Sequence, residues 1–170
     1  CAKAGLCEEK KPLASLFFVG PTSVGKTYTA KQIAKHYFGN ERAFVQVNMS
    51  ELQDETGISK LIGASAGYVG FDQGGFLTNF VRNNPNSVVL FDEVEKSSPK
   101  VLNLLLHLLD EGYLTDNLNR DVDFSKCVVV LTSNIGNEES KKKSMGFISD
   151  DISEDQSYKD SVKKKLKPEL

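Results

Sequence analysis

Four short apolar runs recur along the chain at residues 16–19, 43–47, 87–91 and 127–131. The run at residues 16–19 is continuously apolar, which is typical of a strand buried on both faces of a sheet, and the other three also predict strands. Stretches with helical spacing lie between them, and strands that alternate with helices favour a parallel sheet. The pattern therefore predicts an α/β domain with a mostly parallel central sheet and helices on both faces.

Three stretches between these runs carry helical signals. Residues 26–38 predict a helix that stops at the Gly39-Asn40 pair, and residues 76–81 predict a second. Pro99 fits the first turn of a third, strongly apolar helix. The apolar positions expected along that third helix are Leu102, Leu105, Leu106 and Leu109. A small hairpin is expected over residues 113–124.

Two further segments lack a core pattern. Residues 57–75 contain six glycines, which predicts a loop region with specific turns and little core. Residues 137–160 are charged and rich in serine, which predicts a mobile surface segment before a last lysine-rich helix.

Composition narrows the classes of protein. The chain has 170 residues, 39% of them apolar and 26% charged, as expected for one globular domain. A net charge of −2 gives no reason to expect nucleic acid or an anionic membrane as partner. No apolar run approaches the roughly 20 residues that cross a bilayer. The cysteines at positions 1, 7 and 127 match neither a disulfide framework nor a zinc spacing, which favours a reducing compartment. Cys127 opens an apolar strand and is expected in the core.

The first apolar run leads into a phosphate-binding pattern, G-x-x-x-x-G-K-[ST], which stands between a strand and a helix as that motif requires. Its residues are Gly20, Pro21, Thr22, Ser23, Val24, Gly25, Lys26 and Thr27. Backbone N–H groups at such a loop and at the following helix N-terminus bind polyphosphate. Lys26 is expected to reach the β- and γ-phosphates, and the Thr27 hydroxyl to bind Mg²⁺. A chance glycine turn is the competing interpretation, and the complete motif in this context argues against it.

Polar residues also end the third and fourth apolar runs. Asp92 is expected to hold Mg²⁺, and Glu93 to act as the base that polarises the attacking water. Asn134 is placed to hold that water or to touch the γ-phosphate. Ligands of parallel sheets bind beyond the carboxyl ends of the strands, so these residues are expected to converge on the phosphate loop. Without that loop, two acidic residues and an asparagine would only be strand ends and turn formers.

Several strings, taken in order, resemble the second ATPase domain of the Clp AAA+ unfoldases. They are residues 20–27, 61–64, 67–70, 92–96, 108–116, 122–124 and 131–134. The resemblance covers nearly the whole chain. It implies the three-layer P-loop NTPase fold of AAA+ proteins, ATP hydrolysis with Mg²⁺, and a hexameric ring of identical subunits that threads unfolded polypeptides through its pore. It also implies the bacterial cytoplasm, or the matrix or stroma of an organelle of bacterial descent.

The resemblance assigns further residues. Tyr68 and Val69 match the pore loop that grips the threaded chain, and Asn134 matches the sensor asparagine. Residues 116–121 match a second pore-facing loop, but Asn117, Leu118, Asn119 and Arg120 replace a run that often contains glycine, so the shape of this loop stays open. Met145, Gly146 and Phe147 are similar to the loop by which ClpA and ClpC dock on the ClpP peptidase. This similarity favours the peptidase-coupled branch, with a ClpB-type disaggregase as the alternative.

Two departures from the family pattern affect the expected activity. Ser23 stands where relatives commonly carry glycine, at a free position of the motif, so binding is expected to survive. The chain stops at Leu170, before the family's arginine finger and helical small subdomain. We therefore expect residues 1–170 to be the large subdomain of a longer protein, weakly active or inactive as an ATPase on its own.

Two other classes of protein fit the sequence less well. A GTPase or small-molecule kinase is disfavoured because no Asn-Lys-x-Asp string or arginine-rich lid is present. A non-hydrolysing scaffold or a DNA-remodelling relative is disfavoured because Lys26, Asp92 and Glu93 are intact and the net charge is near zero.

Overall fold

The computed structural model describes residues 11–54, 56–64, 67 and 74–134. The strands are β1 (Ala14–Val19), β2 (Phe44–Asn48), β3 (Val88–Asp92), β4 (Tyr113–Thr115), β5 (Asp121–Asp123) and β6 (Val128–Ser133). The α-helices are α1 (Lys26–Tyr37), α2 (Gly57–Ile62), α3 (Phe76–Asn83) and α4 (Pro99–Glu111), and two 3-10 turns are η2 (Met49–Glu51) and η4 (Val94–Lys96).

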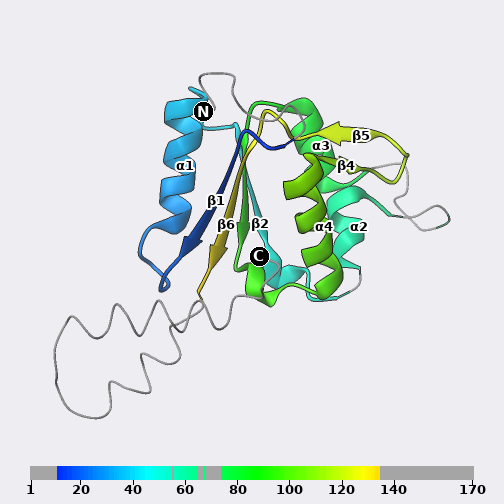
Figure 1. Cartoon of the computed structure of the whole chain (residues 1–170), viewed down its shortest axis with the longest axis horizontal. Helices are drawn as coiled ribbons and strands as arrows, with labels where there is room; N and C mark the ends of the chain where they lie inside the picture. The colour runs from blue at the N-terminus through cyan, green and yellow to red at the C-terminus, as the bar shows by residue number, and fades with distance from the viewer. Residues whose placement is uncertain (1–10, 55, 65–66, 68–73, 135–170) are drawn as a thin grey trace, which may run out of the picture.

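The four apolar runs form one parallel sheet with the strand order β1-β6-β3-β2 (Figure 1). The last of the described strands, β6, thus lies between β1 and β3. In register, Val19 of β1 pairs with Ser133 of β6, and Phe91 of β3 pairs with Leu131. The predicted parallel sheet is confirmed, and its carboxyl ends finish level with one another.

Alternate residues of the central strands enter two separate cores. One core packs α1 against the sheet through Ala30 and Ala34, and its strand residues are Val88, Leu90, Val128 and Val130. The other core lies under α2, α3, α4 and the β4–β5 hairpin, and its residues on β3 and β6 are Val89, Phe91, Val129 and Leu131. Figure 1 shows α1 on one side of the sheet and the remaining helices on the other. The predicted three-layer arrangement is confirmed.

The predicted apolar helix is α4, and its ends carry strong local signals. The Ser98 hydroxyl accepts a hydrogen bond from the backbone N–H of Val101 at 3.4 Å, Pro99 occupies the first turn, and Gly112 ends the helix at φ 71°. The fully buried positions are Val101, Leu105 and Leu108, and Leu102 and Leu109 are partly buried against the same core. So many leucines follow one another here that periodicity alone does not select the buried stripe.

The prediction of little core over residues 57–75 is wrong for its first part. Residues 57–62 form α2, and Leu61 is 1% exposed within the larger core. The glycines mark the ends of this helix: Gly57 lies so close to Leu52 that a Cβ would meet its Cα at 2.9 Å. Gly63 ends α2 at φ 105°. Glycine content therefore concealed a short helix between two positions where only glycine fits.

The β4–β5 hairpin is confirmed, and its turn has a defined shape. Asn119 adopts φ 54°, a left-handed conformation that asparagine tolerates better than most residues. The turn is fixed to the end of α2, because the backbone N–H of Asn117 donates to Ile62 O at 3.0 Å and its side-chain amide donates to Ala64 O at 2.9 Å. The shape left open by the sequence is a tight, anchored turn.

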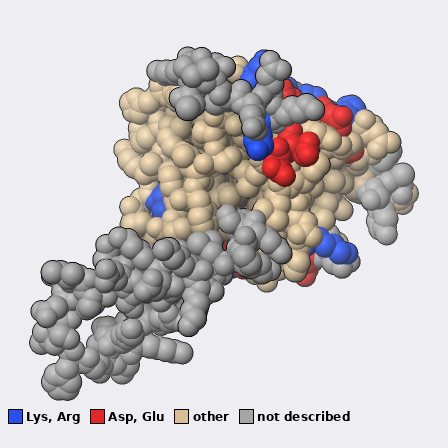
Figure 2. Space-filling model, in the orientation of Figure 1, with Lys and Arg blue, Asp and Glu red and all other residues tan. Residues whose placement is uncertain are grey.

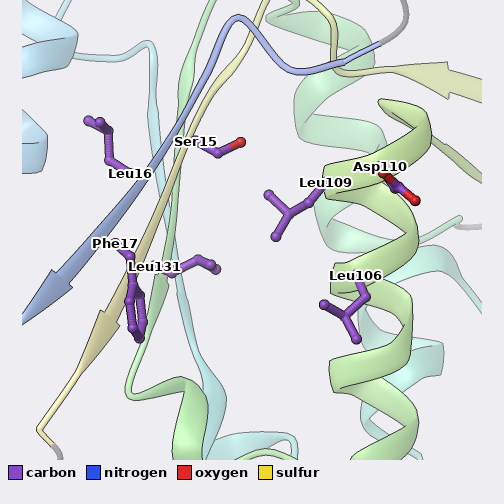
Figure 3. A pocket seen from close by; sticks show the side chains of 7 residues that line it. All are labelled: Ser15, Leu16, Phe17, Leu106, Leu109, Asp110 and Leu131. Carbon is purple, nitrogen blue, oxygen red and sulfur yellow. The ribbon is translucent and has the colours of Figure 1, made fainter. Parts of the chain in front are cut away.

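An apolar groove of about 650 Å³ runs between β1 and α4. Figure 3 shows Leu106 and Leu109 pointing from α4 toward the strands, with Phe17 and Leu131 on the opposite wall. It lies at the outer edge of β1, which pairs only with β6 among the described strands.

The described surface carries a mixture of charges. On the face shown in Figure 2, acidic and basic side chains lie next to one another at one end, and most of the remaining described surface is uncharged. Within the described residues, no helix is both long enough and apolar enough to span a bilayer. Tyr68, Val69, Met145, Gly146 and Phe147 lie outside the described residues, as does the segment 137–160.

Candidate active site

The phosphate loop, β3 and β6 meet at one edge of the sheet. The backbone N–H of Gly20 donates to Ser133 O at 3.2 Å and so continues the β1–β6 pairing by one residue into the loop. Asn134 follows Ser133 directly, and Asp92 ends β3 on the other side of β6. The predicted convergence of the three polar strand ends is therefore present, with Asn134 in the middle.

The phosphate loop leads directly into the N-terminus of α1. Gly25 caps α1 at φ 96°, and a Cβ there would meet nothing within 4 Å. The start of α1 carries no side-chain cap and no acidic residue in its first turn. These features leave the positive end of the helix dipole facing the loop and fit the binding of an anionic phosphate group. Ser23 adopts φ 69°, a left-handed conformation that costs a non-glycine residue about 1 kcal/mol.

Lys26 lies at the centre of the site. Its ammonium donates to Gly20 O at 2.6 Å, to Pro21 O at 2.9 Å and to Asn134 Oδ1 at 2.6 Å. Burial lowers the pKa of Lys26, and the negative charges of nearby carboxylates oppose that shift. An ammonium held by polar oxygens at the helix start is placed to meet phosphate oxygens.

Asn134 links Lys26 to Glu93. The amide nitrogen of Asn134 donates to Glu93 Oε1 at 2.7 Å, while its Oδ1 accepts from Lys26. The backbone N–H of Asn134 donates to Glu95 Oε1 at 3.0 Å. A cation on one side and a carboxylate on the other fix which way the amide points, since only its oxygen accepts and only its nitrogen donates. The three predicted catalytic residues therefore form one hydrogen-bonded chain.

Glu93 is held in an unusual backbone conformation. It adopts φ 60° and ψ 54°, a left-handed geometry that costs a non-glycine residue on the order of 1 kcal/mol. Its N–H donates to Thr132 Oγ1 at 3.1 Å, and the same hydroxyl donates to Asp92 Oδ1. Asp92 Oδ2 accepts from the side-chain amide of Gln46 at 2.9 Å. Thr132 thus positions both acidic residues from the neighbouring strand.

Comparison with known proteins identifies the family. The model of the AAA domain (Cdc48 subfamily) matches residues 11–170. The chain belongs to this AAA family. Its site geometry accords with that assignment, and the AAA domain is an ATPase domain that binds nucleotide.

Individual relatives of this chain are Clp proteins. The chain is 53% identical over 135 residues to the mitochondrial chaperone protein ClpB4 of Arabidopsis thaliana, and the match covers 79% of this chain and 14% of that protein. It is 47% identical to the chaperone protein ClpB of Clostridium perfringens, covering 99% of this chain and 19% of that protein. It is 46% identical to the ATP-dependent Clp protease ATP-binding subunit ClpC of Staphylococcus saprophyticus, covering 99% of this chain and 20% of that protein. These matches confirm the resemblance to Clp AAA+ proteins, and the chain spans about a fifth or less of each relative's length.

Two oxygen-bearing side chains of the site, Thr27 and Asp92, suit a hard cation. Thr27 lies in the first turn of α1 and Asp92 at the end of β3, and both offer oxygen, the ligand that Mg²⁺ prefers. Within the part of the chain that the structure describes, no group of three or more His, Cys, Asp or Glu side chains could hold a metal ion by itself. An ion at this position would therefore take its other ligands from phosphate and water, as Mg²⁺ commonly does.

The sequence did not predict a role in the site for four residues that contact its members: Gln46, Glu95, Lys96 and Thr132. Thr132 carries a usable signal, because it belongs to a polar strand end beside Asn134. Glu95 and Lys96 follow the acidic pair directly, but nothing in their spacing shows that they contact Asn134 and Glu93. Gln46 is an exposed polar residue of an edge strand, which gives no signal at all.

Proposed function

We propose that this domain hydrolyses ATP, with Lys26, Asn134 and Glu93 as the residues that contact the reacting groups. The observation that carries the proposal is the hydrogen-bonded chain from the phosphate loop through Asn134 to the Glu93 carboxylate, at 2.6 Å and 2.7 Å. Such a chain joins a phosphate-binding cation to a base through an amide that can hold water between them.

Each residue has a separate task in the reaction. The Lys26 ammonium binds the β- and γ-phosphates, and partial burial strengthens its interaction with them. Glu93 accepts a proton from the water molecule that attacks the γ-phosphorus, and ADP leaves with inorganic phosphate as the second product. Asn134 orients that water between the phosphate and the base. Mg²⁺, held by Thr27 and Asp92, would neutralise charge on the phosphates.

Two variants separate binding from hydrolysis. Lys26→Ala removes the phosphate-binding cation and is expected to weaken MgATP binding at least 10-fold, measured by titration calorimetry on the 170-residue chain. Glu93→Gln keeps the shape of the base and should retain binding while lowering hydrolysis by the complete protein about 100-fold or more. Tight MgATP binding by Lys26→Ala, or undiminished turnover by Glu93→Gln, would refute these roles.

We propose further that the complete protein is a hexameric Clp chaperone that unfolds polypeptides and threads them through its pore, in the bacterial cytoplasm or in an organelle of bacterial descent. The ClpB and ClpC relatives support this proposal. Tyr68 and Val69 are the proposed grip, because an aromatic side chain gives nonspecific apolar contact with many sequences. Tyr68→Ala should abolish unfolding of a tagged model substrate while ATP is still hydrolysed. Undiminished unfolding would contradict the grip.

Coupling to a ClpP peptidase is the proposed use of this unfolding, supported by the similarity of Met145, Gly146 and Phe147 to the docking loop. Phe147→Ala in the complete protein should abolish ClpP-dependent degradation and spare ATP hydrolysis. The alternative is a ClpB-type disaggregase, which the ClpB relatives support about as well as the ClpC relative supports coupling to a peptidase. Recovery of aggregated substrate, with degradation unaffected by Phe147→Ala, would decide for that alternative.

A further inference from the structure

Both oxygens of the Glu93 carboxylate are held, each from a different direction. Oε1 accepts from the amide of Asn134 at 2.7 Å, and Asn134 in turn contacts Lys26. Oε2 accepts from the ammonium of Lys96 at 2.7 Å. The oxygen bound by Asn134 is therefore linked to the phosphate loop, and the oxygen bound by Lys96 is not.

Lys96 is placed by the same turn that begins at Glu93. Glu93 caps η4, and the backbone N–H of Lys96 donates to Glu93 O at 2.9 Å. A second contact ties this turn to β6, since Glu95 Oε1 accepts from the backbone N–H of Asn134. The backbone of the turn and the end of β6 thus fix the Cα of Lys96 relative to Glu93 and Asn134.

The contact with Lys96 contributes little to stability. The Lys96 and Glu93 side chains are 47% and 23% exposed, and an i,i+3 pair near the surface typically contributes well under about 1 kcal/mol. Its effect on orientation is larger, because a glutamate side chain has several rotatable bonds and a base must be held within about 0.5 Å of its working position. A carboxylate oxygen has two lone pairs, so Oε1 can accept from Asn134 and still receive a proton.

We propose that Lys96 is a positioning residue for ATP hydrolysis: it holds Oε2 of Glu93 and thereby keeps Oε1 directed toward Asn134 and the phosphate loop. This inference rests on the proposed function of Glu93 as the base. Lys96 acts through Glu93 and needs no contact with the nucleotide or with the attacking water molecule.

The test compares three lysine variants in the complete ATPase. Lys96→Met keeps the length of the side chain and removes its charge, and it should lower kcat about 10-fold, since a misplacement of 1 Å can cost up to 100-fold. The KM for MgATP should stay within about twofold, and the melting temperature should not change. Lys96→Arg keeps a cationic donor and should restore kcat to within about threefold of wild type. Lys126→Met, at an exposed lysine before the amino end of β6, is the matched control and should leave kcat unchanged.

A double-mutant cycle separates positioning from general damage. In the Glu93→Gln background, Lys96→Met should cause no further loss of kcat, because its effect passes through the carboxylate that is already absent. An equal loss in both backgrounds, an unchanged kcat, or a raised kcat in Lys96→Met would each overturn the inference. If Glu93→Gln hydrolyses ATP as fast as wild type, the proposed function fails, and the inference fails with it.

Discussion

The β4–β5 turn supplies a sharp test of how a buried charge stabilises this domain. The Asp116 side chain is fully buried, and its Oδ1 accepts from the backbone N–H groups of Leu118 at 2.9 Å and Arg120 at 3.0 Å. Its Oδ2 accepts from the Arg120 guanidinium at 2.8 Å and 2.7 Å, and Arg82 of α3 lies at 3.4 Å. The substitution Asp116→Asn keeps the shape and removes the charge.

The expected loss follows from these contacts. The asparagine must turn its NH₂ group toward one of the two sets of donors, so one set loses its acceptor. Each hydrogen bond to a charged group contributes about 1.5–3 kcal/mol. The two arginine side chains are 38% and 47% exposed and regain hydration when released, which reduces the loss. We expect a net destabilisation of about 2–3 kcal/mol, which lowers the melting temperature by roughly 4–12 °C for a chain of this size.

The pH dependence adds a second readout. Burial alone would raise the pKa of Asp116, but the hydrogen bonds from the Arg120 side chain and from backbone N–H groups outweigh it, so the pKa lies below its usual 3.8. A depressed pKa gives stabilisation that is fully present above the unfolded value of about 3.9 and is lost as the pH falls through the folded value. The melting temperatures of wild type and Asp116→Asn should therefore converge below about pH 4.

Thermal unfolding followed by circular dichroism measures both effects on the 170-residue chain. Asp110→Asn is the control, because the Asp110 side chain is 81% exposed and lies 3.9 Å from Lys11. It should melt within about 1 °C of wild type. Melting of Asp116→Asn within 2 °C of wild type at pH 7, or a difference that persists unchanged to pH 3, would refute the argument.

Two further predictions concern the core. Gly75→Ala should destabilise the chain by about 2–3 kcal/mol in urea unfolding, since a Cβ would lie 2.1 Å from the carbonyl oxygen of Leu61, a backbone atom that cannot rotate away. Gly39→Ala meets no atom within 4 Å and should cost only the strain of its φ of 69°, about 1 kcal/mol, so equal losses would contradict the close approach at Gly75. Burial raises the pKa of the Cys127 thiol to about 11, so peptide mapping should find it unmodified by iodoacetamide at pH 8 until urea is added. Rapid modification of Cys127 in the folded chain would show that it is accessible.

Local patterns predicted most of the fold and the members of the site, but not the contacts between them. The strand before Gly20 and the glycine, lysine and threonine of the phosphate loop are signals carried by neighbouring residues. The place of Asn134 between Lys26 and Glu93 depends on strand order, which periodicity does not contain. The contact of Lys96 with Glu93 depends on a 3-10 turn and a left-handed backbone angle, neither of which has a distinct sequence pattern. In the case of α2, glycines at both ends hid the helix.

The central position of β6 also bears on how the chain folds during synthesis. β1 ends at Val19, but β6, its only partner among the described strands, is complete only at Ser133, 114 residues later. At roughly 5–20 residues per second, a ribosome needs about 6–23 s to make that stretch. Throughout this interval the apolar strand that leads into the phosphate loop lacks its partner β6, and β3, once it has been made as far as Asp92, lacks the same partner on one side. The edges of β1 and β3 that pair with β6 therefore stay open until synthesis has reached residue 133, and an unpaired strand edge can pair with another chain.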